Sequence, residues 1–179
     1  MPAEIRTILE EMHDSLVCEE ELRKKFIQRI DEGMWTRDEN PDTHINVMFA
    51  PYDPEQKKVF LGHHIKADLH IFTGGHIDQG ETARQALIRE MQEEWGFTLP
   101  TPTIPQLVTF KVIDNPRQRC TGHFDIWYFF SVKQNAFKPD HTLLNKEFST
   151  IGWITLDEAD SIVTDPPTMK GIARIKTLL

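Results

Sequence analysis

The chain has 179 residues with 28 acidic and 20 basic side chains, which gives a formal net charge of −8. That length suits one domain with an appendage and a sizeable hydrophobic core rather than two full domains. The acidic balance argues against nucleic acid as the main partner, because phosphate contacts need clustered Lys and Arg. No apolar run approaches the roughly 20 residues of a membrane span, so no membrane partner is expected.

The chain start and the cysteines predict the compartment. The first residues, MPAEIRTILEEMHD, are acidic and lack the basic and then apolar pattern of a secretory signal peptide. Cys18 and Cys120 are too few for a disulfide framework, and a single bridge is not expected in a reducing compartment. We therefore expect a reduced, cytoplasmic protein.

Apolar residues recur every three or four positions over residues 3–31, which predicts two helices. The two stripes are Ile5, Leu9, Met12 and Leu16, and then Leu22, Phe26 and Ile30. The simplest interpretation is that the helices cover a sheet, and the alternative is a dimer contact or a lid over a site. We assign residues 1–40 to a helical arm with its linker and residues 41–179 to the main domain, and we keep a homodimer as an alternative assembly.

Short strand-like runs follow the linker. They are predicted over residues 45–50, 58–65, 69–73, 106–113, 124–132 and 151–154. The sequence PYDP at residues 51–54 predicts the turn between the first two runs. The run at 124–132 carries apolar side chains on both faces, which is typical of a central strand.

Helices are predicted between and after these runs. Thr82 with Gln85 forms a capping-box pattern that predicts a helix start, and Gly96 predicts its left-handed C-terminal cap. A second capping-box pattern, Thr155 with Glu158, predicts a short helix. A basic helix follows Pro166-Pro167. In the first of these helices an apolar stripe of Leu87, Ile88 and Met91 is expected to pack on the sheet, while Ala83 and Ala86 are expected beside its acids.

Three acids of that helix, Glu90, Glu93 and Glu94, lie within an arc of about 100° on its surface. Like charges three or four positions apart repel one another, and the last turn of a helix disfavours acids because of its dipole. A solvated acidic face is the simpler interpretation, whereas a bound cation would offset both costs. Clustered carboxylate oxygens suit Mg²⁺ or Mn²⁺ better than zinc, which prefers His and Cys.

The segment 75–97, GHIDQGETARQALIREMQEEWGF, combines these acids with glycines and an arginine at fixed spacing. It reads G-x5-E-x7-R-E-U-x-E-E-x-G-U, where U is apolar, and it resembles the Nudix box in full. Residues 44–165 resemble the rest of the Nudix hydrolase (MutT-like) family in outline, as a bacterial subgroup of unassigned substrate. The resemblance implies an α/β protein with the Nudix fold, an α/β/α sandwich around a mixed sheet, to which the N-terminal helical arm is added.

The resemblance also implies an activity, the metal-dependent hydrolysis of a nucleoside diphosphate linked to a further group X. Glu90, Glu93 and Glu94 would bind Mg²⁺ or Mn²⁺, and Arg89 would orient them by charge-assisted hydrogen bonds. The ions would neutralise the diphosphate and activate a water that attacks phosphorus. Nucleoside triphosphates, ADP-ribose, dinucleotide cofactors and nucleotide sugars all stay open as substrates.

Supporting roles follow from the same resemblance. Gly75 would shape the loop before the helix, and Glu81 would support that loop or the outer shell of the metal. Glu147 lies a few residues before the Trp153 strand, where many members place a further acid, and it is a candidate ligand or general base. The proton of the attacking water would pass to Glu93 or Glu147, and the simpler interpretation of Glu147 is an exposed loop acid.

Several histidines fall near the box in the sequence, namely His63, His64, His70, His76 and His123. No Cys accompanies them at ligand spacing, which argues against zinc. His64, His76 and His123 are candidate substrate contacts, although satisfied structural histidines are the default interpretation. Arg117 and Arg119 lie in the polar loop 114–122 and are candidates for phosphate binding, with solvated side chains as the alternative.

Three other functions fit parts of the pattern. A catalytically silent nucleotide sensor can share the fold, but degenerate box acids would favour it and all are present here. An isopentenyl diphosphate isomerase also resembles this fold, but it needs a reactive cysteine in a context that Cys120 does not match. An RNA decapping enzyme is disfavoured because the chain lacks a dense basic patch.

Overall fold

The computed structural model describes residues 6, 9, 18–102, 105–117 and 119–179. In this part of the chain, seven strands form one mixed sheet. They are β1 (Thr43–Asp53), β2 (Lys58–His64), β3 (Leu69–Ile71), β4 (Thr73–His76), β5 (Leu107–Val112), β6 (Gly122–Ser131) and β7 (Phe148–Thr155). The helices are α2 (Glu20–Asp31), α3 (Ala83–Trp95), α4 (His141–Leu144), α5 (Leu156–Ile162) and α6 (Pro166–Thr177). None of the helices described is long and apolar enough to cross a membrane.

Strand β1 is the centre of the sheet. It pairs in parallel with β6 along one edge, and along the other edge it pairs antiparallel with β4 and then with β2. The remaining pairs, β2 with β3, β2 with β7 and β5 with β6, are antiparallel. The expectation that residues 124–132 form a central strand is confirmed, because β6 lies between β1 and β5.

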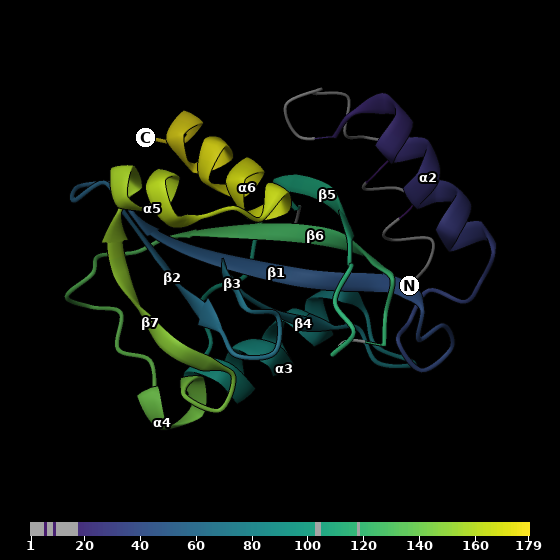
Figure 1. Cartoon of the computed structure of the whole chain (residues 1–179), viewed down its shortest axis with the longest axis horizontal. Coiled ribbons are helices and arrows are strands. Elements are labelled where there is room, and N and C mark those ends of the chain that lie inside the picture. The colour runs from purple at the N-terminus through teal and green to yellow at the C-terminus, as the bar shows by residue number, and fades with distance from the viewer. Residues whose placement is uncertain (1–5, 7–8, 10–17, 103–104, 118) are drawn as a thin grey trace.

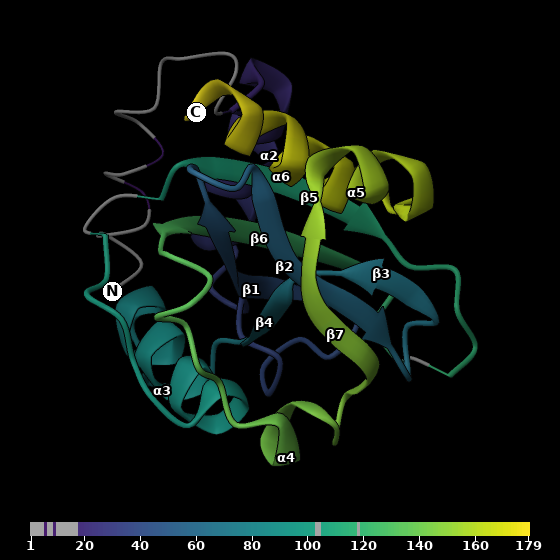
Figure 2. The same cartoon turned by 90° about the vertical axis from the view of Figure 1, so that its left-hand side faces the viewer.

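Helices cover the sheet from two sides, as Figures 1 and 2 show: α3 lies below it and α5 with α6 lie above it. This is the α/β/α sandwich expected from the sequence. One core cluster joins α3 and α2 to the lower face through Ile45, Val47 and Phe49 of β1. The other cluster joins α5 and α6 to the upper face through Ala50 and Tyr52. Successive residues of β1 thus serve opposite layers, as the pleat of a strand requires.

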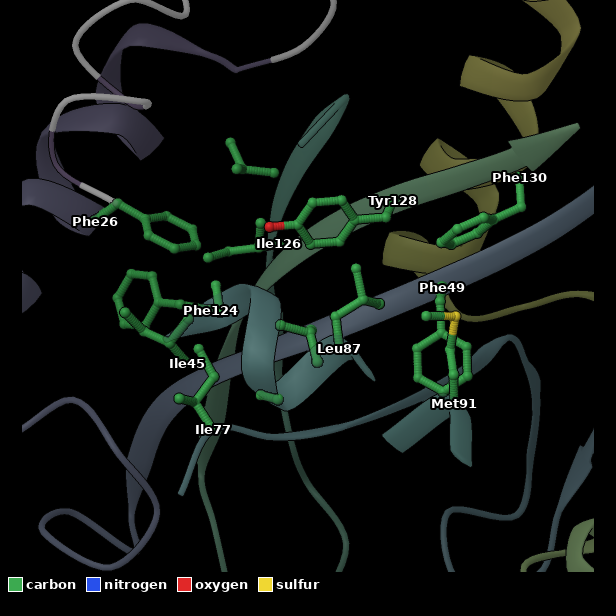
Figure 3. Close-up of a cluster of buried hydrophobic side chains, with 14 of the residues drawn as sticks. Phe26, Ile45, Phe49, Ile77, Leu87, Met91, Phe124, Ile126, Tyr128 and Phe130 are labelled. Carbon is green, nitrogen blue, oxygen red and sulfur yellow. The ribbon is translucent and has the colours of Figure 1, made fainter. Parts of the chain in front are cut away.

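Figure 3 shows the lower core in detail. Leu87 and Met91 of α3 approach the apolar side chains of β1 and β6, among them Phe49 and Ile126. Ile88, which the sequence placed in the same apolar stripe, is 40% exposed. The helix is therefore rotated on the sheet relative to the expected stripe, and this rotation decides where its acids lie.

The helical arm covers the sheet in its described part, which is the simpler of the two interpretations. Phe26 of α2 is fully buried and meets Phe124 edge to face with ring centroids 4.8 Å apart (Figure 3). Arg29 donates to Met34 O and to Thr43 Oγ1 at the start of β1. The first predicted helix lies mostly outside the described residues. The boundary at residue 40 and a homodimer through the arm stay predictions.

The predicted turn at 51–54 is wrong. Strand β1 continues through residues 51–53, where Pro51 lies opposite Phe130 of β6. On the other edge of β1, pairing with β4 ends at Phe49 and pairing with β2 begins at Tyr52, so Pro51 falls in the gap between these partners. The turn follows at 54–57, where Asp53 Oδ1 accepts from the next backbone N–H groups, as in an Asx turn.

The capping predictions are confirmed. Thr82 and Gln85 make both hydrogen bonds of a capping box, and Gly96 ends α3 in the left-handed conformation. Thr155 and Glu158 also make both hydrogen bonds of a capping box, at the start of α5. The C-terminal helix begins with the prolines rather than after them, because Asp165 caps it and a first-turn proline loses no helical hydrogen bond. The one-turn helix α4 has no counterpart among the predicted elements.

Gly62 and Gly152, in the paired strands β2 and β7, differ in how closely the neighbouring strand approaches them. A Cβ at Gly62 would overlap Thr150 O and the backbone of Ile151, whereas a Cβ at Gly152 would meet nothing within 4 Å. Because backbone atoms cannot yield as a side chain does, we expect Gly62→Ala to lower the free energy of unfolding by about 1–3 kcal/mol. Urea unfolding measures the change. Gly152→Ala is the matched control, and equal effects in the two variants would contradict this account.

Candidate active site

The carboxylates of α3 face strand β4 rather than open solvent. The Glu90 carboxylate lies directly against Gly75, where a Cβ would overlap it. The Glu94 side chain is 7% exposed, its Oε1 accepts from Gly74 N at 3.3 Å, and its Oε2 has no hydrogen-bond partner within the described part of the chain. Gly75 was expected in a loop, but it lies in β4, where its missing side chain makes room for Glu90.

The neighbours of these acids on the helix also differ from expectation. Ala83 and Ala86 are buried in the lower core rather than placed beside a ligand. With α3 rotated in this way, Glu90 and Glu94 continue the buried face of the helix, while Glu93 is 60% exposed. The small alanines allow α3 to lie close to the sheet, and this close approach brings the acids against β4.

Arg89 holds the loop, the strand and the helix together. Its Nε and Nη2 donate to the two oxygens of Glu81 at 2.8 Å, and Nη2 also donates to His76 O at 2.9 Å. Its Nη1 donates to Glu90 Oε1 at 2.8 Å and lies 3.5 Å from Glu93 Oε2. The two-oxygen contact with Arg89 lowers the pKa of Glu81. A single guanidinium therefore orients two of the α3 carboxylates.

A fourth acid reaches the same place from outside the helix. Glu147, between α4 and β7, lies with its Oε2 3.5 Å from His64 Nε2, and the hydrogen bond with His64 lowers the pKa of Glu147. Burial raises the pKa values of Glu90 and Glu94, and the negative charge of Glu147 adds to this rise. Glu147 therefore lies near the α3 acids, and it lines the same cavity as Glu90 and Glu93.

The electrostatics of this cluster favour a cation. Burial is the main cause that raises the pKa of Glu90, and it raises the pKa of Glu94 well above its ordinary value. Buried like charges cost free energy unless protons or a cation neutralise them. Oxygen donors in this number suit a hard divalent ion such as Mg²⁺ or Mn²⁺, and the unpartnered Glu94 Oε2 is an acceptor that such an ion would satisfy.

These acids form one wall of a cavity of about 880 Å³. Glu90, Glu93 and Glu147 line it together with Gly75 and Arg89. The upper face of the sheet near the starts of β1 and β6 also lines the cavity, and we call this part the sheet wall. The polar side chains of that wall are His44, Asn46, His76, Lys111, His123 and Asp125. A cavity of this size accommodates a nucleotide-sized ligand.

Asp125 is the most perturbed acid on the sheet side. It is 3% exposed, and burial raises its pKa to about 7, although the positive charge of Lys111 and hydrogen bonds from Thr109 and Asn46 oppose that shift. Asn46 and Asp125 are register partners on β1 and β6. A carboxyl group that holds a proton near neutral pH can both donate and accept hydrogen bonds, which suits recognition of a polar ligand group.

Most of the predicted substrate contacts line this cavity. His64, His76, His123 and Arg119 belong to its lining, whereas Arg117 does not, and its side chain is exposed. Sequence reasoning missed the sheet wall formed by His44, Asn46 and Asp125. The alternation in HIN at 44–46 and HFD at 123–125, with polar residues on either side of a core residue, is the pattern that indicates it.

The chain resembles known proteins over most of its length. The family model described as NUDIX domain matches residues 42–175. The 8-oxo-dGTP diphosphatase of Escherichia coli (strain K12) is 28% identical over 129 residues, which cover 69% of this chain and 90% of that protein. A NUDIX family hydrolase from Clostridium perfringens superposes with a TM-score of 0.56 at 21% identity, over 76% of this chain and 98% of the other. The dihydroneopterin triphosphate pyrophosphohydrolase of E. coli has the same TM-score at 17% identity, over 78% and 94%.

The raised pKa values of the buried acids imply that the stability of the metal-free protein depends on pH. The pKa of Glu94 is raised, so the folded chain holds this proton more tightly than the unfolded chain does. The free energy of unfolding must then fall as pH rises from the ordinary value of 4.5 through the raised pKa. Glu94→Gln removes this contribution, and we expect the variant to melt a few degrees above the wild type at pH 8 in a chelating buffer.

The control for this experiment is Glu93→Gln, which changes an exposed carboxylate on the same helix. Thermal unfolding at several pH values between 5 and 8 compares the three proteins. Glu90 and Asp125 shift in the same direction, so some pH dependence should persist in Glu94→Gln. A pH profile for Glu94→Gln parallel to that of the wild type would contradict the assignment.

Proposed function

This chain belongs to the Nudix hydrolase family, and from that premise we propose that it uses divalent cations to hydrolyse the diphosphate linkage of a nucleoside diphosphate joined to a further group X. As a Nudix pyrophosphohydrolase, it acts on nucleoside diphosphate derivatives. The observation that carries the metal-dependent part of the proposal is that Glu90, Glu93 and Glu147 all line the large cavity, while burial and the charges of these three acids raise the pKa of Glu94.

Glu90, Glu93 and Glu94 are the proposed ligands of Mg²⁺ or Mn²⁺. Their oxygens suit these ions, and the charges of Glu93 and Glu147 oppose ionisation of the buried Glu90 and Glu94. A cation bound there would neutralise the diphosphate and make a coordinated water acidic enough to serve as the nucleophile. The choice between the two metals rests on the family pattern alone.

Other side chains would position the metal ligands and take the proton from the attacking water. Arg89 keeps the Glu90 carboxylate against Gly75 and is a positioning residue, because its guanidinium is bonded to Glu81 and Glu90. Glu93 and Glu147 are the two candidates to take the proton from the attacking water. Glu93 is exposed to the cavity, whereas Glu147 is already paired with His64.

The identity of X depends on the sheet wall of the cavity. Asn46, Asp125 and the three histidines offer neutral donors and acceptors there, and Lys111 and Arg119 offer positive charge. The relative that is 28% identical is an 8-oxo-dGTP diphosphatase, and nucleoside triphosphates are therefore the first substrates to test. ADP-ribose, dinucleotide cofactors and nucleotide sugars complete the panel, with product identification as the measurement.

The contact between Gly75 and Glu90 gives a test of the metal site. In Gly75→Ala the added methyl group overlaps the end of a flexible side chain rather than backbone, so the Glu90 carboxylate should move while the fold persists. We expect Mn²⁺ affinity to fall by at least about tenfold, as it does when groups around a metal are disturbed. Metal titration followed by calorimetry measures it, with circular dichroism as the check on folding.

Glu90→Gln is the matched variant for that experiment, because it removes the charge without a steric change. Both variants should lose Mn²⁺ affinity to a similar extent. A Gly75→Ala protein that is folded and binds Mn²⁺ as the wild type does would remove Glu90 from the ligand set.

The reaction itself is tested by Glu93→Gln. Turnover of the best substrate in the panel should fall by about 10²-fold or more, since a general acid–base group typically contributes that much, while the melting temperature stays close to that of the wild type. Glu147→Gln, assayed beside it, decides which acid takes the proton. Near-normal activity of Glu93→Gln would reject its role, and a wild-type protein that binds the panel with Mg²⁺ but turns over none of it would favour the silent sensor.

A further inference from the structure

Three histidines from three different strands meet on the sheet wall of the cavity. They are His44 on β1, His76 on β4 and His123 on β6. His44 is the register partner of His123, and His76 lies opposite Asn46, two positions further along β1. One ring nitrogen from each of the three lies within 4.8 Å of the other two. Sheet pairing, rather than a flexible loop, thus fixes the relative positions of the three rings.

His44 carries the most specific evidence for a ligand. Its ring is 1% exposed, and its Nδ1 lies 3.1 Å from Asn40 O, a carbonyl that can only accept a hydrogen bond. Nδ1 therefore carries the proton, and Nε2 is left with a free lone pair. Nε2 is buried and has no hydrogen-bond partner within residues 18–102, 105–117 and 119–179 or at the two isolated described positions. A histidine whose far nitrogen donates to a backbone carbonyl has the arrangement that metal-bound histidines show.

We propose that His44, His76 and His123 form a binding site for one divalent transition-metal ion of the zinc type, separate from the carboxylate cluster of α3. Three imidazole nitrogens suit Zn²⁺, whereas carboxylate oxygens suit Mg²⁺. Burial is the main cause that lowers the pKa values of His76 and His123 to about 3 and about 2, and the charge of His44 adds to both shifts. The rings are accordingly neutral at neutral pH, as ligands must be.

Binding of the ion requires two movements of side chains. Ligand nitrogens about 2.0–2.1 Å from zinc lie roughly 3.4 Å apart in a tetrahedron, so the three rings must close by up to about 1.4 Å from their widest separation of 4.8 Å. His76 and His123 are partly exposed to the cavity and can turn. Arg37, 3.4 Å from His76 Nδ1, must turn away, and Asp78 lies 3.7 Å from its guanidinium as an alternative partner.

The fourth position of such a site would face the cavity. Cys120 Sγ lies 2.9 Å from His123 Nε2, so the thiol is one candidate for that position and a ligand oxygen is the other. A three-histidine site with an open position binds an anionic or water oxygen. The proposed ion would therefore lie in the cavity that is proposed to hold the substrate, where it could bind an oxygen of that substrate. This last role rests on the proposed function, whereas metal binding itself does not.

The test is a zinc titration of the full-length protein after treatment with a chelator. Saturating Mg²⁺ is included to occupy the carboxylates, and zinc binding is followed by competition with a chromophoric chelator. We expect about one equivalent of Zn²⁺ to bind, and His44→Asn and His123→Asn each to lose on the order of 100-fold or more in affinity, since even outer partners of a ligand contribute about 10- to 100-fold. Co²⁺, whose visible absorption reports nitrogen ligation, gives a second readout.

The controls separate this site from other zinc-binding groups. His63→Asn removes a ring of the other histidine pair, His63 and His70, whose ring centroids lie 5.0 Å apart outside the site, and it should bind zinc as the wild type does. Glu93→Gln should lose turnover but keep zinc affinity, which distinguishes failure of this proposal from failure of the hydrolase assignment. Cys120→Ser decides the fourth ligand.

Several results would overturn the proposal. They are a wild-type protein that binds no zinc under these conditions, a His44→Asn variant that binds zinc unchanged, and zinc affinity that falls with Glu93→Gln rather than with the histidine variants. Because His44 is buried, circular dichroism checks that its variant is folded. The partly exposed His123 provides the variant that decides the question if His44→Asn does not fold.

Discussion

The burial of two acidic side chains between a helix and a glycine strand is the constraint on which this site depends. Glu90 and Glu94 lie on the inner side of α3, where β4 offers them a glycine pair in place of side chains. Burying carboxylates that repel one another is unfavourable, and the apolar contacts of Leu87 and Met91 hold the helix in place despite that cost. The fold thus keeps negative charge concentrated at one cavity wall.

Arg89 stabilises part of this acidic cluster but does not neutralise all of its carboxylates. Its guanidinium fixes the Glu81 carboxylate and one oxygen of Glu90, and it also binds the carbonyl of His76. The loop, the edge strand and the helix are therefore cross-linked by one side chain. Glu94 lies beyond the reach of these hydrogen bonds, and its second oxygen keeps its capacity to accept.

Local signals in the sequence predicted local structure well. Both capping boxes and the glycine cap of α3 were correct because each depends on residues within one helical turn. The turn after β1 was misplaced because the position of Pro51 depends on which partner strand ends beside it. The rotation of α3, which buries the alanines and exposes Ile88, is likewise set by packing against β1 and β6 rather than by spacing along the helix.

The site divides in the same way. The α3 acids, Arg89 and Glu81 could be predicted because one motif contains them. The pairing that builds the sheet wall could not, because His44 and His123 are 79 positions apart in sequence and become neighbours only through the parallel register of β1 and β6. The same register places Asn46 beside Asp125, although no single sequence motif contains both residues.

The hydrogen bond from His44 to Asn40 limits where the chain can be cut without changing the cavity. Asn40 is held by Thr36 O and in turn accepts from Thr43 N, so the linker is bonded into the start of β1. A protein cut before residue 41 would keep every strand and all the acids of α3. His44 would nevertheless lose the carbonyl that selects its tautomer. The protonation pattern of one imidazole in the cavity is thus decided by a residue outside the domain that we assigned from the sequence.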